Sequence, residues 1–386
     1  MKRIAYELNA TTPAAADEVG IRRAKIRALN FDAARNCTML LTLLAHAAMP
    51  YAQRKWQVHD PVGTVHCDNF LMLSGIFKMD MFFLIAGFFS AANLDREGVT
   101  RYSKNRLQQL LMPMLVAFCS FQVIEALIKT YWPTANGVGS PFSGQPMTGH
   151  LWFMVDTLIF TAVAMTCMQR GSWPDRLLSW MFKGVKGPIE LIALSSVVTA
   201  GLILAVALLT RFTGMGSDAF ELFGVTGLGR LAENSPIFII GMVIYRSAKL
   251  REAMASVHPL WLLPAVLMGG LLKGNLSPDA SWAMTQLSLS FFCWLGMLSF
   301  LAFWSWLIPA SGRLTKWLRD ASFTVYLSHH VVVIAMATLL VGVPWPSEIK
   351  FVLVAVAALG LSAGFHHGLV KHNASLSWLL NGRRLS

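Results

Sequence analysis

Arg35 and His46 are spaced so that both would lie on one face of an α-helix. Their separation of 11 residues corresponds to about three full turns, so the two side chains would lie roughly 16 Å apart along the axis. An arginine at one end of such a face can bind phosphate, and a neutral imidazole deeper along it can accept a proton. Two plainer roles stay open: a snorkelling anchor for Arg35 and a carbonyl-bonded structural histidine for His46.

Other ionisable residues interrupt further apolar segments. Lys78 and Asp80 are two residues apart and would point to different faces of one helix, so each needs a partner on another helix. A structural ion pair is the plainer role for Asp80. His150 and Trp152 begin another apolar stretch, where an aromatic belt would also place them.

A late apolar segment carries Tyr326, His329 and His330. Ionisable groups inside a membrane are costly and usually functional, and two adjacent histidines near mid-membrane are not explained by anchoring. At least one of them should therefore face a polar cavity. Further buried candidates, with less sequence context, are Glu125, Glu233 and Asn234.

The composition indicates what kind of element positions these residues. Of the 386 residues, 55% are apolar and 13% are charged, whereas soluble domains carry about 25% charged residues. This deficit excludes a disordered chain and argues against a nucleic-acid-binding protein despite the net charge of +12. Low charge with many aromatic residues is typical of a multi-pass membrane protein.

The hydropathy pattern predicts an all-α integral membrane protein with a bundle of about ten transmembrane helices. A spanning helix needs about 20 mostly apolar residues, and no segment shows the period-2 alternation of a membrane barrel. The ten predicted spans cover approximately residues 34–53, 70–92, 108–131, 150–168, 189–210, 230–246, 259–273, 282–308, 321–343 and 349–370.

The positive charges predict the orientation of these spans. Across alternate connections, 24 of the 32 lysines and arginines fall on one side and 7 on the other, which places both termini in the cytoplasm. Orientation and contact with anionic lipid then account for the basic excess. The predicted organisation is a basic cytoplasmic segment (1–33), a membrane domain (34–372) and a short cytoplasmic tail (373–386). The first segment is either an interfacial helix or a plain tail.

The candidate residues suit two classes of reaction. Arg101, Lys104 and Arg106 add cations beside Arg35 at the inner boundary, while several spans bring ionisable groups to a similar depth. This pattern fits transfer of a group from an anionic cytoplasmic donor across the membrane, and it also fits transport of an anion or a proton-coupled solute. The five cysteines have no metal-ligand spacing, so no metal site is expected.

Five motifs in order make the chain resemble the acyltransferase-3 family of integral-membrane acyltransferases. The first is an Arg followed by ten residues and a His, and the second is an aromatic run ending in Gly and Phe. A basic turn followed by Pro, a His-Leu-Trp-Phe element, and an Ala-Ser-aromatic-x-x-Tyr-Leu-x-His pattern complete the set. In the same order, the five motifs are found at Arg35 and His46; Phe82–Phe88; Arg101, Arg106 and Pro113; His150–Phe153; and Ala321–His329.

The resemblance implies an enzyme of the bacterial inner membrane that has no bound cofactor. It would transfer an acetyl or succinyl group from a cytoplasmic acyl-CoA to a glycan hydroxyl outside. His46 would be a general base or acyl relay, together with Arg35 and His329 in the catalytic group. The CoA phosphates would bind Arg35, Arg101 and Arg106. The remaining expected substrate contacts are Lys78, His150, Trp152, Tyr326 and His330.

Two other functions remain open. The first is a transporter or exporter of a small anion or glycan, against which stands the lack of paired broken helices in matching halves of the chain. The second is a scaffold for a polysaccharide synthase, which would leave His46 and His329 without a role. The sequence does not specify the acyl group, the acceptor or the oligomeric state.

Overall fold

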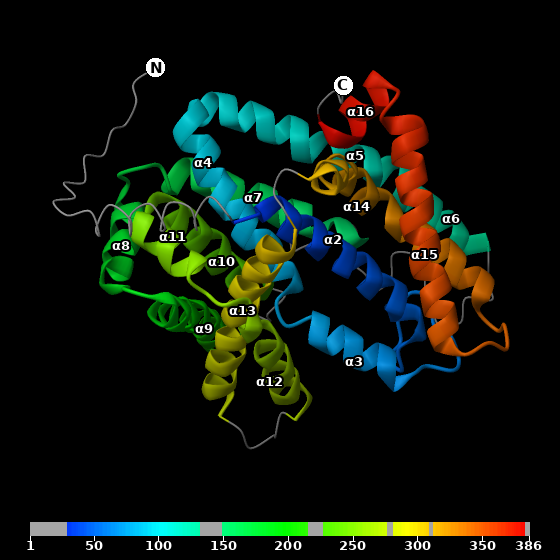
Figure 1. Ribbon diagram of the computed structural model, residues 1–386, viewed down its shortest axis with the longest axis horizontal. Coiled ribbons are helices and arrows are strands. Elements are labelled where there is room, and N and C mark those ends of the chain that lie inside the picture. The colour runs from blue at the N-terminus through cyan, green and yellow to red at the C-terminus, as the bar shows by residue number, and fades with distance from the viewer. Residues whose placement is uncertain (1–28, 132–148, 215–226, 276–280, 309–311, 383–386) are drawn as a thin grey trace.

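A computed structural model describes residues 29–131, 149–214, 227–275, 281–308 and 312–382. Regular structure within these ranges is helical and includes no strand (Figure 1), which confirms the all-α class. The helices are α2 (Phe31–Ala48), α3 (Val65–Ser74), α4 (Lys78–Arg106), α5 (Met112–Ala117), α6 (Val123–Tyr131), α7 (Trp152–Cys167), α8 (Trp173–Met181), α9 (Pro188–Thr213), α10 (Leu228–Arg246), α11 (Ala248–Ala255), α12 (Leu262–Gly274), α13 (Trp282–Leu307), α14 (Arg313–Leu340), α15 (Ser347–Phe365) and α16 (Ala374–Asn381). The interfacial helix considered for residues 1–33 lies almost wholly outside the described residues.

Six described helical stretches are long and apolar enough to cross a membrane, and a seventh is formed if a pair bent by 69° (Ala248–Ala255 with Pro259–Gly274) counts as one span. Helices occupy all ten predicted segments, but the count of ten spans is not confirmed. Two of the predicted spans, α2 and α10, do not qualify because polar residues dilute their hydropathy. The multi-pass character of the chain follows, while the position of its termini stays a prediction.

The second and third predicted spans belong to one continuous helical stretch, Val65–Tyr131. Its direction changes at Gly98, whose φ of 74° lies in the left-handed region that favours glycine. Figure 1 shows α4 rising to this turn before the chain continues through η2 (Leu107–Leu111), α5 and η3 (Phe118–Gln122) into α6. The turn places Arg106 over the pocket described below.

Helix α2 lies at the centre of the bundle, in contact with α3, α4, α13, α14 and α15 (Figure 1). Asn30 caps it by accepting a hydrogen bond from the Ala33 amide at 2.9 Å, and its own side-chain amide donates to the carbonyl of Ile308 at 2.9 Å. The many alanines and threonines of α2 allow its neighbours to approach on most sides. The polar residues that interrupt its hydropathy are therefore enclosed by other helices.

A pair of glycines sets the close packing of α4 against α10. A Cβ at Gly87 would overlap the carbonyl oxygen of Phe238, and a Cβ at Gly241 would crowd the backbone of Leu84. Small residues at a helix interface allow backbones to approach in this way. This contact fixes the position of α4, several of whose residues line the pocket described below.

Candidate functional site

Four histidines from three segments of the chain converge beside the end of α2. His46 comes from α2, His150 from the short turn before α7, and His329 with His330 from α14. The ring of His46 lies 5.2 Å from that of His329 and 5.0 Å from that of His330, measured between centroids. The rings of His150 and His330 stack at 4.4 Å. The sequence predicted that ionisable groups of separate spans lie at a similar depth, and the structure brings these four together.

The hydrogen bonds of His329 determine the state of His46. His329 Nδ1 lies 2.8 Å from the carbonyl oxygen of Tyr326, and because a carbonyl only accepts, this nitrogen carries the proton of the neutral ring. His329 Nε2 is then an acceptor, and His46 Nδ1 lies 2.9 Å from it. The proton of neutral His46 therefore sits on Nδ1, which leaves the lone pair of Nε2 available as a base.

His330 is held by a buried carboxylate. Its Nδ1 donates to Glu125 Oε1 at 2.8 Å, and both side chains are 2% exposed. Lys129, one turn further along α6, places its Nζ 3.9 Å from the other carboxylate oxygen. A buried charge needs such partners, so Glu125 fixes His330 and, through ring stacking, orients His150.

His150 is bonded on two sides but leaves one ring nitrogen without a partner. The amide of Gln122 donates to His150 Nδ1 at 3.2 Å, and the hydroxyl of Tyr326 donates to the backbone carbonyl of His150 at 2.8 Å. The proton of neutral His150 is then on Nε2, which is buried without a hydrogen-bond partner among the described residues. The backbone carbonyl of Leu327 acts on this N–H, which would have to turn from it to donate to a bound substrate.

Only one of the four histidines is more than slightly exposed. His150, His329 and His330 are 6%, 1% and 2% exposed, whereas His46 is half-buried. His46 is near the end of α2, where the chain continues into the short turn η1 (Met49–Tyr51). His46 is therefore the member of the group that a substrate hydroxyl can approach most readily.

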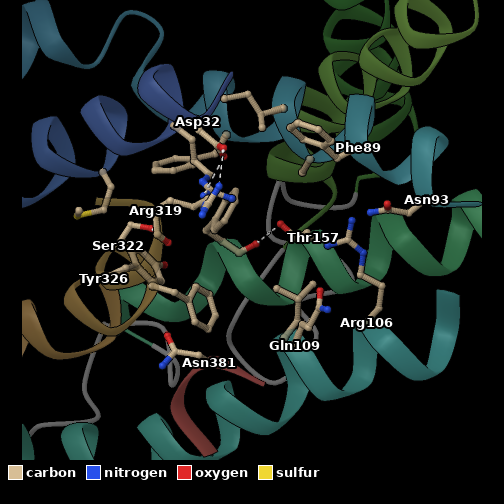
Figure 2. Close-up of a pocket in the computed structure, with 18 residues that line it drawn as sticks. Asp32, Phe89, Asn93, Arg106, Gln109, Thr157, Arg319, Ser322, Tyr326 and Asn381 are labelled. Atoms are coloured by element: carbon tan, nitrogen blue, oxygen red, sulfur yellow. Dashed lines mark hydrogen bonds and ion pairs between the residues drawn. The ribbon is translucent and has the colours of Figure 1, made fainter. Parts of the chain in front are cut away.

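At the other end of α2, a pocket of about 450 Å³ opens between α2, α4, α7 and α14 (Figure 2). Three arginines, Arg35, Arg106 and Arg319, line it together with neutral hydrogen-bonding groups and several aromatic rings. The neutral polar groups are those of Asn93, Gln109, Thr157, Ser322 and Asn381. Cations beside aromatic rings suit a ligand with an anionic head and a less polar arm.

Two of the arginines share a carboxylate. Asp32 lies 3.2 Å from Arg35 and 3.9 Å from Arg319, and Figure 2 shows Asp32 beside Arg319 at one wall. Arg106 approaches from α4, where its Nη2 lies 3.4 Å from Ser90 Oγ and its guanidinium lies over the ring of Tyr102. The pocket therefore presents arginines from α2, α4 and α14 to an anionic ligand.

Tyr326 connects the pocket with the histidines. It lines the pocket, donates to the backbone of His150, and has its ring 6.0 Å from that of His329. Phe153, whose ring lies 6.4 Å from that of Tyr326, and Met39 also line the pocket. Tyr326 thus belongs both to the pocket lining and to the contacts of His150 and His329.

Lys78 lies close enough to His46 to act on it electrostatically, and two of the predicted site residues, Trp152 and Arg101, lie elsewhere. Lys78 begins α4 and is 9% exposed, but it takes no part in the hydrogen bonds and ring contacts that join the four histidines. The ring of Trp152 lies 4.7 Å beneath the guanidinium of Arg230. Arg101 is exposed and is not among the residues that line the pocket.

Glu125, His150 and His330 are the described residues closest to a metal-binding arrangement, with ligand atoms within 4.8 Å of one another. The two imidazole planes differ by 17° and are stacked. Because an imidazole lone pair lies in the plane of its ring, an ion in the plane of one ring would lie out of the plane of the other. These rings would have to turn before both could bind one ion. That the protein binds no metal stays a prediction from the sequence.

Several residues of the site were not predicted from the sequence. Asp32 could have been found as the i−3 neighbour of Arg35, and Gln122 as the i−3 neighbour of Glu125 on one helix face. Arg319 contributed only to the charge map, and no sequence signal points to Asn381. Both reach the pocket through tertiary packing.

Comparison with known proteins gives the chain a family. The model of the acyltransferase-3 family, described as an acyltransferase domain, matches residues 29–367. Proteins named Glucans biosynthesis protein C from Salmonella paratyphi B, Salmonella heidelberg and Salmonella dublin are each 26% identical to the chain over 141 residues. The aligned part covers 34% of this chain and 37% of each relative. No solved structure matches the chain.

The family match includes Arg35, the four histidines and the pocket arginines. It also extends over most of the described helices. Together with the apolar helices, it establishes that this chain belongs to the acyltransferase-3 family of integral-membrane acyltransferases.

Proposed function

We propose that this protein is a membrane-bound O-acyltransferase that moves an acyl group, succinyl or acetyl, from cytoplasmic acyl-CoA to a hydroxyl of a periplasmic or cell-surface glycan. The family supports acyl transfer within a membrane. The name Glucans biosynthesis protein C, borne by relatives aligned over 37% of their length, supports a glycan acceptor. The location proposed is a bacterial inner membrane with the pocket arginines on the cytoplasmic side.

The contact between His46 Nδ1 and His329 Nε2 is the observation that carries this proposal. It leaves His46 Nε2 unprotonated, on the one half-buried member of an otherwise buried histidine group. A positioned imidazole base accelerates such reactions by about 10²–10⁴-fold. A transporter does not require a base held in this tautomer.

The donor would bind in the pocket at the other end of α2. Arg35, Arg106 and Arg319 would make charge-assisted hydrogen bonds to the phosphates of CoA. The aromatic rings deeper in the pocket would enclose the less polar arm, whose thioester end would reach Tyr326. Holding donor and acceptor in line would supply the part of the rate that base catalysis does not.

The transfer step follows from these positions. His46 Nε2 takes the proton of the acceptor hydroxyl as its oxygen attacks the thioester carbonyl carbon. The carbonyl oxygen becomes negative and is stabilised by the Nε2–H of His150. The C–S bond then breaks, the ester forms, and the CoA thiolate leaves with the proton returned by His46.

The proposal is tested in cells that lack the gene and are complemented with wild-type protein. Acyl substituents on periplasmic and surface glycans are measured by mass spectrometry. We expect one class of ester to disappear in the deletion strain and return on complementation. Identical acylation in the deletion strain would exclude the proposed acceptors, and transport without acyl transfer in proteoliposomes would support the transporter instead.

A further inference from the structure

The last described helix, α16, reaches the pocket although it lies beyond the family match. The match ends at residue 367, and α16 runs from Ala374 to Asn381. The sequence predicted a short cytoplasmic tail over 373–386, which stays a prediction, and within it α16 packs against α5, α14 and η7 (His366–Val370). Asn381, its final residue, lines the pocket. In Figure 2, Asn381 lies by the end of the α16 ribbon, well apart from Asp32.

The end of α16 is held firmly against the bundle. Asn373 caps the start of the helix by accepting from two amides at 3.0 Å, and Leu380 near the end is 3% exposed. Gly382 follows with a φ of 63°, and a Cβ there would overlap the carbonyl oxygen of Gln108. A larger residue at this position would push α16 away from η2, so glycine is what allows Asn381 to reach the pocket.

One side of the Asn381 carboxamide is fixed and the other is free. Thr324 Oγ1 donates to Asn381 Oδ1 at 3.1 Å, and His366 Nδ1 lies 3.0 Å from the same hydroxyl. Asn381 is 7% exposed, and its Nδ2 is buried without a hydrogen-bond partner among the described residues. Buried N–H groups are nearly always bonded, so this one, on a residue that lines the pocket, lacks a partner that a ligand could supply if the side chain turns toward it.

We propose that Asn381 Nδ2 donates a hydrogen bond to a neutral carbonyl oxygen on the arm of the acyl donor. This inference rests on the proposed function. The neighbouring polar groups of the pocket, Ser322 and Gln109, are neutral, whereas the arginines that suit phosphate come from α2, α4 and α14. A neutral carboxamide pairs well with an amide carbonyl and adds no charge that would compete for the phosphates. Helix α16 therefore completes the donor pocket of this chain.

Two substitutions separate this role from a merely structural one. Asn381→Asp keeps the oxygen that accepts from Thr324 but replaces the free donor by an acceptor. Asn381→Leu removes both functions at similar volume. Ser375→Asp, on an exposed position of the same helix, is the control for added charge. Each purified protein is assayed for binding of coenzyme A, for the KM of acyl-CoA and of acceptor, and for thermal unfolding.

We expect Asn381→Asp to weaken coenzyme A binding and to raise the donor KM by roughly three- to tenfold. This factor corresponds to the net free energy of one hydrogen bond. The acceptor KM should match that of wild type and Ser375→Asp. Asn381→Leu, which buries no charge, should raise the donor KM to a similar extent while unfolding near the wild-type temperature. Unchanged coenzyme A binding by Asn381→Asp, when wild type binds, would overturn this inference alone. If the wild-type protein binds no coenzyme A and transfers no acyl group, both the proposed function and this inference fail.

Discussion

His46 Nδ1 and His329 Nε2 lie 2.9 Å apart, although 283 residues separate them in the sequence. This contact joins α2 to α14, and a second contact between the same helices, from Asp32 to Arg319, lies at the pocket. The two helices therefore run in the same direction with paired polar groups at both ends. One end suits an anionic donor and the other suits the activation of a hydroxyl.

Substitution of His329 should lower turnover without removing His46. His329→Leu deletes the acceptor that holds the proton of His46 on Nδ1, so kcat is expected to fall by roughly 10²-fold. His329→Gln retains a side-chain oxygen able to accept this bond and should recover part of the loss. The kcat is measured at saturating donor and acceptor, with unfolding temperatures as the control. Equal activity in the Leu and Gln variants would contradict the orienting role of His329.

Asp32 should compete with the donor phosphates for the arginines of the pocket. Its carboxylate lies between Arg35 and Arg319 and is 35% exposed, so a bound polyanion must displace it. Asp32→Asn is expected to lower the KM of acyl-CoA by roughly two- to fivefold, which corresponds to the free energy of an exposed ion pair. Arg35→Ala is expected to raise this KM.

Donor and acceptor KM values are compared for these variants and for Arg170→Ala. Arg170 is 73% exposed and lies outside the pocket, so its variant should behave like wild type. Identical donor KM values for wild type, Asp32→Asn and Arg35→Ala would exclude a phosphate-binding role for this end of α2.

A buried ion pair between Lys350 and Asp60 should contribute to stability away from the pocket. The two charged atoms lie 2.6 Å apart, with side chains 3% and 1% exposed. Lys350→Met leaves the carboxylate buried without its cation and should destabilise the protein by about 3–5 kcal/mol. Adding Asp60→Asn should restore most of this loss in detergent unfolding experiments. A double variant as unstable as the single one would show that the pairing is not the cause.

Removal of divalent metal should leave acyl transfer unchanged. Glu125, His150 and His330 offer suitable donor atoms, but their ring stacking would have to be broken to bind an ion. The activity of purified protein is compared before and after dialysis against EDTA. A loss of activity that zinc restores would show that these residues bind a metal and that the bond from His330 to Glu125 has another role.

The helical class and the main chemical residues could be predicted because they depend on local sequence. Low charge identifies the membrane class, and the separation of Arg35 and His46 follows from helix geometry. The pairing of Glu125 with His330 crosses 205 residues, so no local pattern reveals it. The count of ten spans stays a prediction, because length and composition qualify only six or seven of the described helical stretches and leave out α2 and α10. The place of Asn381 depends on how α16 packs, which its composition does not specify.

The most direct measurement is the initial rate of acyl transfer by His46→Ala. Purified wild-type protein, His46→Ala and His367→Ala, a variant of an exposed histidine, are reconstituted into lipid nanodiscs. They are supplied with acyl-CoA and glycan, and both CoA release and glycan ester are quantified. We predict that His46→Ala loses about 10²–10⁴-fold in rate while binding coenzyme A like wild type, and that His367→Ala is unaffected. Acyl transfer by His46→Ala at the wild-type rate would contradict the assignment of His46 as the catalytic base.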